Sequence, residues 1–355
     1  MRILFCVLIT KTFISKKCCF FMDERKSYSA YLREKFPPKE GFVKKMEALL
    51  GEAGAKEFFD ISYTKCPSSI RCNTLKMDAK ELLKRLKNYG WIVRQPFKDF
   101  PEVMIVDSGP GPGDLGKTRE HLLGYYYVQE ISSMLPMMAL RPEEGDHVLD
   151  LCASPGSKTT QAAAMMKNGG FILANELNMG RIGILNSNLE RCGVMNTIVC
   201  RMEGVALCDR LFKKSQFRFD KILVDAPCSG EGTLRKSPKT FEMWNPHMIR
   251  KIAKTQRALA SAAFKLLKVD GVMIYSTCTL SPEENEMTVN YLLRKFDCEV
   301  EKLSLPLKFR SGVCEWEGEK FSDEVSKCLR LYPQDNDTDG FFVARIRKIS
   351  DEVKR

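Results

Sequence analysis

The feature that most constrains the fold is an alternation, from about residue 120 onward, of short apolar runs with helix-length segments. The runs are continuously apolar, as expected of strands that are buried on both faces. Their alternation with helices predicts a parallel α/β sheet, and such sheets bind ligands at the carboxyl ends of their strands. The runs are HVLDL (147–151), FILANE (171–176), NTIVC (196–200), FDKILVDA (219–226), GVMIYST (271–277) and FFVARI (341–346).

The preceding part of the chain has a different pattern. Residues 22 to about 64 are predicted to be helical, with Pro37-Pro38 as a break between two helices. Next, SSIRCNTLKM is strand-like, DAKELLKRLKNYG is a helix that Asp78 can cap, and WIVRQ is again strand-like. At about 150 residues per domain, a chain of 355 residues also suggests two domains. We predict a helical and α+β domain over residues 22–115 and an α/β domain over residues 116–349.

Residues 1–21 form a separate segment. The apolar run Ile3–Thr10 is too short to span a bilayer, and no small-residue cleavage site follows it. Met22 then opens an ordinary polar segment. Our hypothesis is that residues 1–21 are non-native or a dispensable extension, and we expect no membrane association.

Charge and cysteine usage narrow the class of partner. Lys and Arg exceed Asp and Glu by 56 − 45, a net charge of +11, which favours a polyanionic partner, most often nucleic acid. The fourteen cysteines include no C-x-x-C pair, and the three histidines are scattered, so zinc-site spacings are missing and we predict no metal. A reduced, intracellular setting with cysteines acting as thiols is expected.

The first apolar run leads into LDLCASPGSKTTQ, which predicts a strand, a tight turn of small residues and a helix starting near Lys158. Small residues let the backbone approach a ligand, and the helix N-terminus favours a negative group. A P-loop would need glycine at positions 152 and 157, and G-x-G-x-x-G is also missing, which disfavours nucleotide triphosphatases and dinucleotide dehydrogenases. FILANE ends in Glu176, whose carboxylate can accept ribose hydroxyls; alone, it is equally consistent with a solvated loop acid.

Two cysteines follow two later strands. Cys228 lies in VDAPCSGEGT and Cys278 in YSTCTLSPEENE. A lone cysteine after a strand is usually a small buried residue, but two at neighbouring strand ends suggest chemistry. A thiolate that adds to C6 of a pyrimidine makes C5 nucleophilic toward an electrophilic methyl group. Asp225 is placed to offset the charge that develops at N3, and the second cysteine can assist when the C5 proton and the thiol leave.

These motifs resemble the RNA 5-methylcytosine methyltransferases of the RsmB/Nop2/Sun type, over about residues 65–348. The pattern is closest to the archaeal tRNA (cytosine-5-)-methyltransferases. The resemblance implies a Rossmann-like, S-adenosylmethionine-dependent class I methyltransferase domain after a smaller N-terminal RNA-binding domain. The other matching pieces are IRCNTL (70–75), YYVQEISSMLP (126–136) and RLYPQDNDTDGFFVA (330–344).

By the same resemblance, the expected activity is methylation of C5 of cytosine in RNA through a covalent Cys–C6 adduct. We expect tRNA as the substrate and large-subunit rRNA as the second choice. A largely non-catalytic RNA-binding assembly factor is the alternative, whereas small-molecule and protein methyltransferases need no cysteine pair. A monomer is expected, in the cytoplasm or in the nucleus, the nucleolus included, of a eukaryotic cell.

The resemblance also implies roles for single residues. Cys278 is expected to be the nucleophile, Cys228 to be needed for product release, and Asp225 to contact the cytosine. A Pro-Cys nucleophile, as in DNA cytosine methyltransferases, would name Cys228 instead. The family's usual CAAPGGK reads CASPGSK here, and Glu203 stands where an aspartate is usual. The residues expected to bind S-adenosylmethionine are Cys152, Ala153, Ser154, Pro155, Gly156, Ser157, Lys158, Glu176, Arg181, Glu203 and Asp225, and those expected to contact RNA are Arg71, Asn73, Gln129, Glu130, Arg235 and Lys236.

Overall fold

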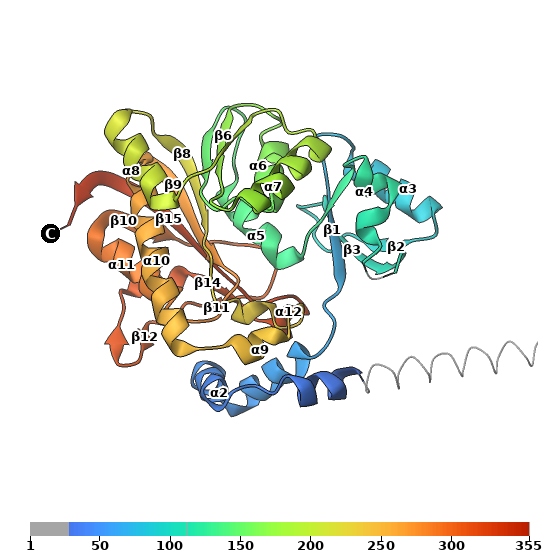
Figure 1. Cartoon of the computed structure of the whole chain (residues 1–355), viewed down its shortest axis with the longest axis horizontal. Coiled ribbons are helices and arrows are strands. Elements are labelled where there is room, and N and C mark those ends of the chain that lie inside the picture. The colour runs from blue at the N-terminus through green and yellow to red at the C-terminus, as the bar shows by residue number, and fades with distance from the viewer. Residues whose placement is uncertain (1–27, 112, 355) are drawn as a thin grey trace, which may run out of the picture. The chain divides into compact units, whose positions relative to one another are not determined.

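The computed structural model describes residues 28–111 and 113–354, which form two compact units (Figure 1). The first unit comprises residues 28–65 together with 234–244, and the second comprises the remaining described residues. This division differs from the predicted boundary at residues 115 and 116, because strands on both sides of that boundary pair within one sheet. The predicted extension, residues 1–21, lies outside the described residues.

The first unit is helical and has an aromatic core. Residues 28–35 are helical and the chain then breaks at Pro37-Pro38, as predicted. The ring of Phe42 packs edge-on against Phe241, with ring centroids 6.0 Å apart, and Tyr63 stacks on Phe241 at 5.1 Å. Segments far apart in the sequence therefore share this core. The other helices of this unit are α2 (Glu40–Ser62), which is interrupted at Gly51, and α9 (Lys239–Met243).

Within the second unit, the chain first forms a four-stranded antiparallel sheet in the order β2-β3-β1-β4. The predicted Asp78 cap is confirmed: its carboxylate accepts a hydrogen bond of 2.8 Å from the Lys80 amide. Both predicted strands are present, whereas β3 was not predicted. The elements are β1 (Ser68–Cys72), α3 (Ala79–Asn88), β2 (Ile92–Arg94), β3 (Val103–Ser108), α4 (Arg119–Leu122) and β4 (Tyr126–Val128).

The larger sheet has nine strands and contains all six predicted runs. Four pairs are parallel, β5 with β6, β6 with β7, β5 with β8 and β8 with β9, while β15 runs antiparallel to β9. The sheet is therefore mixed, since a buried apolar run does not reveal the direction of its strand. Its strands are β5 (His147–Asp150), β6 (Phe171–Asn175), β7 (Thr197–Cys200), β8 (Phe219–Asp225), β9 (Leu267–Thr277), β10 (Phe296–Glu301), β11 (Arg310–Ser311), β14 (Leu329–Leu331) and β15 (Phe341–Val353).

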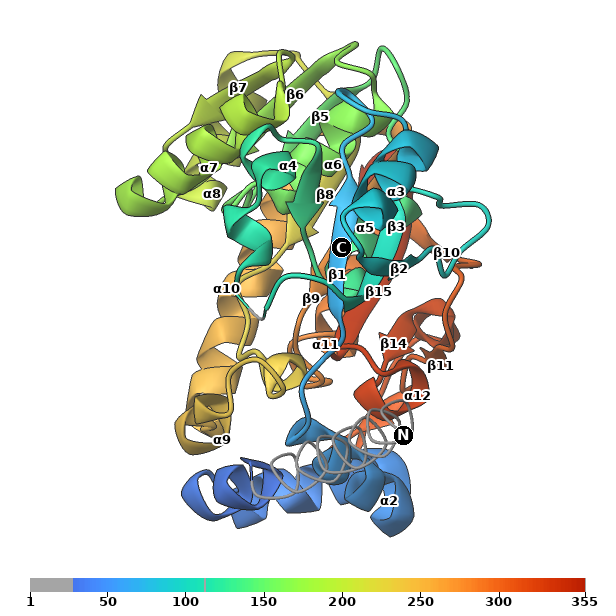
Figure 2. The same cartoon turned by 90° about the vertical axis from the view of Figure 1, so that its right-hand side faces the viewer.

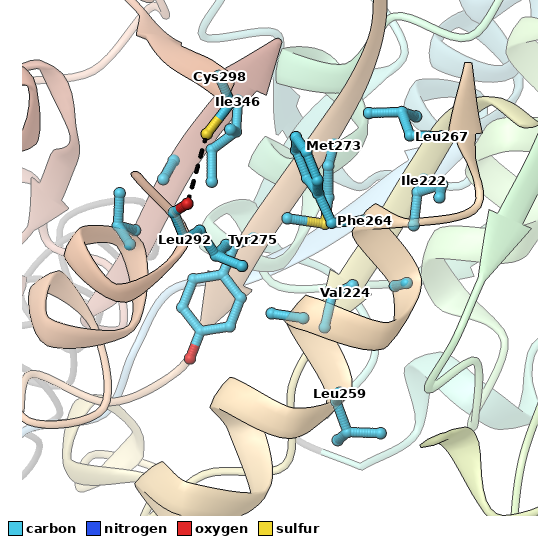
Figure 3. Packing of buried hydrophobic residues seen from close by; sticks show 14 of the residues in the cluster. Ile222, Val224, Leu259, Phe264, Leu267, Met273, Tyr275, Leu292, Cys298 and Ile346 are labelled. Carbon is cyan, nitrogen blue, oxygen red and sulfur yellow. Dashed lines mark hydrogen bonds between the residues drawn. The ribbon is translucent and has the colours of Figure 1, made fainter. Parts of the chain in front are cut away.

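Helices cover both faces of the large sheet (Figures 1 and 2), which confirms the predicted α/β class. On one face, Leu259 and Phe264 of α10 belong to an apolar cluster with Ile222 and Met273 of the central strands (Figure 3). On the other face, side chains of α5 and α6 such as Leu135 and Ala163 form a second cluster. The helices are α5 (Ile131–Leu140), α6 (Ser157–Met165), α7 (Met179–Cys192), α8 (Gly204–Lys214), α10 (Pro246–Phe264), α11 (Glu286–Lys295) and α12 (Pro333–Asn336).

A small two-stranded sheet of β12 (Glu315–Trp316) and β13 (Glu319–Lys320) lies between β11 and β14 in the sequence. Among the described residues, no helix is both long enough and apolar enough to cross a bilayer. The same part of the chain holds no group of three or more His, Cys, Asp or Glu side chains that could bind a metal ion.

Candidate active site

The two predicted cysteines meet at the carboxyl edge of the large sheet. Cys278 directly follows β9, Cys228 lies in the loop after β8, and their Sγ atoms are 3.1 Å apart. The loops are packed closely: Gly232 donates its amide to the carbonyl of Cys278 at 2.9 Å. A Cβ atom at Gly232 would lie 2.2 Å from the carbonyl oxygen of Gly340, so this approach requires glycine.

The environment distinguishes the two thiols. The hydrogen bond with Cys278, together with burial, raises the pKa of the Cys228 thiol well above its usual value. Cys228 therefore keeps its proton at neutral pH and is the hydrogen-bond donor of the pair.

Asp225 connects the cysteines to the cofactor loop. It is the last residue of β8, and its Oδ1 accepts a hydrogen bond of 2.8 Å from Ser276 Oγ. Its Oδ2 lies 2.7 Å from Nζ of Lys158, and the Lys158 side chain is only 10% exposed. Lys158 also donates to Ser133 Oγ at 3.0 Å. A partly desolvated ion pair thus lies at the same sheet edge as the cysteines.

The loop between β5 and α6 has the predicted strand–turn–helix form. Gly156 precedes α6 with a φ of 101°, a conformation that L side chains rarely adopt. Within the described residues no side chain caps this helix, so amide groups of its first turn are available to a ligand. The hydroxyl of Ser154, an addition to the family's usual loop, donates to the Arg181 carbonyl at 3.0 Å and thus contacts α7.

The acidic residues expected at the cofactor follow β6 and β7. Glu176 is nearly buried, accepts a hydrogen bond from the Asn178 amide at 2.8 Å and contacts Arg181 at 3.2 Å. Arg181 also donates to the Ser154 carbonyl at 2.7 Å and so ties the loop to Glu176. Glu203 is exposed, and its two carboxylate oxygens accept hydrogen bonds from amides of α8 at 3.1 and 2.8 Å. Glu203 therefore caps a helix.

Asn175 is a site residue that our sequence analysis missed. Its amide nitrogen donates to the carbonyls of Leu151 and Met202, both at 3.1 Å, and its Oδ1 accepts from the Met202 amide. This one side chain joins the ends of three strands beneath Glu176. Its position as a polar residue at the end of the apolar run FILANE was the available signal.

Two of the predicted RNA contacts, Arg71 and Asn73, are wrong. Both side chains are fully buried. Arg71 donates to the Ser157 carbonyl at 2.7 Å and to Thr160 Oγ1 at 2.8 Å. Asn73 donates to two backbone carbonyls at 2.8 Å. These donors hold the fold together and present no surface to RNA.

Gln129 and Arg235 are corrected for the same reason. Gln129 is buried and donates to the Ser133 carbonyl at 3.1 Å. Arg235 is 9% exposed and donates to the Lys65 carbonyl at 2.7 Å within the first unit. Glu130 is half-buried and caps α5, whereas Lys236 is exposed and stays a predicted RNA contact.

The donor set of this edge fits a ligand that carries a carboxylate and a ribose. The uncapped amides of α6 can bind a carboxylate, and Glu176 at the end of the next strand can accept ribose hydroxyls. A family model described as 16S rRNA methyltransferase RsmB/F matches residues 137–347. The chain belongs to the RsmB/F family of RNA methyltransferases. Its cofactor is S-adenosylmethionine and its substrate is RNA. A second model, the N-terminal domain of 16S rRNA methyltransferase RsmF, matches residues 38–131.

Individual relatives agree with this family. The tRNA (cytosine(49)-C(5))-methyltransferase of Pyrococcus abyssi is 41% identical over 294 residues, which are 83% of this chain and 92% of that protein. The ribosomal RNA small subunit methyltransferase F of Vibrio parahaemolyticus is 40% identical over 87% of this chain, which spans 63% of that protein. A methyltransferase homologue from Pyrococcus horikoshii has a similar structure, with a TM-score of 0.78, 32% identity and coverage of 90% of this chain and 98% of that one.

Proposed function

We propose that this RsmB/F family member methylates C5 of cytosine in RNA, with tRNA as its first substrate. The observation that carries the proposal is the Cys228–Cys278 pair, 3.1 Å between sulfur atoms, beside Asp225. Methylation of a nitrogen or an oxygen needs no thiol, whereas carbon C5 of cytosine must be activated by covalent addition at C6.

The first step is addition of Cys278. The target cytosine must leave its stack to reach the sheet edge. The Cys278 thiolate forms a bond to C6, and the electron pair of the C5–C6 double bond moves toward C5 and N3. Lys158 and Asp225, 2.7 Å apart, are placed to offset the negative charge at N3.

The cofactor is proposed to bind in the loop before α6. S-adenosylmethionine supplies the electrophilic methyl group that C5 accepts. The amides of the first turn of α6 bind its carboxylate, Glu176 accepts its ribose hydroxyls, and Arg181 holds both the loop and Glu176. The residues proposed to form this site are Cys152, Ala153, Ser154, Pro155, Gly156, Ser157, Lys158, Glu176, Arg181, Glu203 and Asp225.

The last step regenerates the enzyme. The C5 proton leaves to water, the C5–C6 double bond re-forms, and the bond between C6 and the Cys278 sulfur breaks. Cys228 keeps its proton because its pKa is raised, and it donates a hydrogen bond toward the departing Cys278 thiolate. We propose that this stabilisation is the contribution of Cys228 to product release.

Two RNA classes compete as the substrate. The relative that this chain matches over 92% of the relative's length is named for tRNA, which favours tRNA. The family models and the bacterial relative are named for 16S or small-subunit rRNA, which makes small-subunit rRNA the second candidate in place of the large subunit.

The proposal is tested by incubating the full chain with methyl-labelled S-adenosylmethionine and either unmodified tRNA or 16S rRNA. Digested RNA is then analysed for the labelled nucleoside. We expect 5-methylcytidine, formed faster in tRNA. Label in any other nucleoside would contradict the proposal, and 5-methylcytidine confined to 16S rRNA would select the second candidate. RNA binding without transfer to either RNA would favour the alternative of an assembly factor.

A further inference from the structure

A fully buried carboxylate lies behind the cysteine pair and has no role in the mechanism above. Glu284 follows Cys278 in the segment between β9 and α11, and its side chain is completely buried. Its backbone carbonyl accepts a hydrogen bond of 2.6 Å from the Tyr275 hydroxyl of β9. The residue is thus fixed to the polypeptide segment that carries Cys278.

The carboxylate of Glu284 reaches across to the other cysteine loop. Its Oε2 accepts a hydrogen bond of 3.0 Å from the amide of Ser229, the residue after Cys228. Its Oε1 accepts one of 2.5 Å from the Ser229 hydroxyl. The Ser229 hydroxyl also lies 2.7 Å from Thr279 Oγ1, next to Cys278.

A third element completes this bracing. Gln256 of α10 is fully buried and donates to Glu284 Oε2 at 2.8 Å. The same amide nitrogen donates to the carbonyl of Pro227, the residue before Cys228, at 2.9 Å. Both neighbours of Cys228 in the chain are therefore held, one directly by Glu284 and the other through Gln256.

This arrangement is unfavourable unless it serves a purpose. Burial raises the pKa of Glu284 to about 7, and the buried acid Glu231 adds to the shift. Among the described residues, no lysine or arginine forms an ion pair with Glu284. An apolar side chain would fill such a place at a lower desolvation cost, but it would leave the Ser229 amide and hydroxyl without their acceptor.

We propose that Glu284 is a positioning residue that holds the Cys228 loop against Cys278 and thereby sets the rate of product release. The inference rests on the proposed function, because it requires that Cys228 assist the departure of Cys278. Without Glu284, the Ser229 backbone loses its anchor and the Cys228 thiol shifts away from the Cys278 sulfur. Displacements of about 1 Å at a reacting group can cost about 10²-fold in rate.

The test compares Glu284→Gln with wild type, with Cys228→Ala and with Glu299→Gln, a matched change at an exposed position of β10. Glutamine keeps the size of the side chain, but its NH₂ group meets donors where an acceptor is needed. We expect turnover to fall by about 10²-fold, with the KM for S-adenosylmethionine unchanged. We also expect a protein–RNA adduct that survives denaturant to accumulate, as in Cys228→Ala, and Glu299→Gln to behave as wild type.

The outcomes separate the two claims. Wild-type turnover in Glu284→Gln would overturn the inference, and so would slow turnover without adduct while Cys228→Ala traps one. If Cys228→Ala traps no adduct, the release role of Cys228 fails and the inference fails with it. Should Glu284→Gln not fold, as judged by thermal unfolding, Ser229→Ala removes only one of the bracing groups. It should show a smaller accumulation of the adduct, and its absence would again overturn the inference.

Discussion

The Lys158–Asp225 ion pair joins the cofactor loop to the cysteine pair through two side chains that are mostly shielded from water. Replacing Lys158 by Met removes the cation that offsets charge at the pyrimidine ring. Loss of one such preorganised group costs about 10²- to 10³-fold in kcat. We expect a loss of this size in single-turnover methyl transfer. The control is Lys167→Met, at an exposed lysine after α6; equal losses in the two variants would contradict the role of Lys158.

The buried Asp150 predicts a pH dependence of stability. Burial raises its pKa from 3.8 to about 6 in the folded state. Because the folded pKa lies above the unfolded one, the contribution of Asp150 to stability is complete below the unfolded pKa. It is lost as the pH rises through about 6.

Asp150→Asn cannot ionise and should escape this loss. Between pH 4 and pH 7, the free energy of unfolding of wild type should fall relative to that of the variant by up to about 3 kcal/mol. Urea unfolding over this pH range measures the difference. The exposed Asp99→Asn should show no such change, and a pH-independent difference for Asp150→Asn would refute the explanation.

Single residues differed in how far sequence could predict them. Asp225, Cys228 and Cys278 were predicted to lie together because each lies at or just past the carboxyl end of a strand. Arg71 and Arg235 were assigned to RNA because arginine is usually exposed. Their burial depends on backbone carbonyls supplied by distant segments, which a local pattern does not reveal. Asn175 and Glu284 were missed for the same reason.

At the scale of elements, Arg71 links β1 to α6 by hydrogen bonds to Ser157 and Thr160. Burial lowers its pKa to about 10, so the guanidinium stays charged at neutral pH. Arg71→Met leaves several buried acceptors without a donor and should lower the free energy of unfolding by about 2 to 4 kcal/mol. Urea unfolding measures this.

The same variant tests our correction of Arg71. The salt dependence of RNA affinity should match that of wild type, because the side chain reaches no phosphate. Arg94→Met, at an exposed position of β2, is the stability control. A shallower salt dependence in Arg71→Met would restore the RNA contact first expected there.

Helix α10 offers an exposed basic surface next to the Cys228 loop. Lys251 and Lys254 are exposed, and the buried Gln256 of the same helix contacts the carbonyl before Cys228. Replacing both lysines by Glu should weaken RNA binding. The slope of log affinity against log salt should become shallower by about 1 to 2. Filter binding over a salt series measures this. The pair Lys213→Glu and Lys214→Glu on α8 is the control, and an unchanged slope in the α10 variant would exclude the contact.

The elements themselves were largely predictable. All six apolar runs are strands, and the Asp78 cap and the break at Pro37-Pro38 are present. The direction of β15 was not predictable, because a strand buried on both faces has the same composition in either direction. The partners of β1 likewise depend on β3 and β4, which come later in the chain.

For the whole molecule, the division into units could not be read from local patterns. Residues 234–244 belong to one compact unit with residues before Cys66, although they follow the Cys228 loop in sequence. Aromatic contacts such as Phe42 with Phe241 connect these distant segments. Such long-range packing leaves no periodic signal in one sequence. The monomeric state and the intracellular setting stay predictions, and light scattering of the purified chain tests the first.

The central claim is that Cys278 attacks C6 and that Cys228 releases the product. The most direct measurement is the amount of protein–RNA adduct that survives denaturant after reaction with tRNA and S-adenosylmethionine. We compare wild type with Cys278→Ala and Cys228→Ala. The account predicts no adduct and no methyl transfer with Cys278→Ala, and an accumulated adduct with Cys228→Ala. An adduct trapped by Cys278→Ala and missing from Cys228→Ala would contradict the account and exchange the roles of the two cysteines.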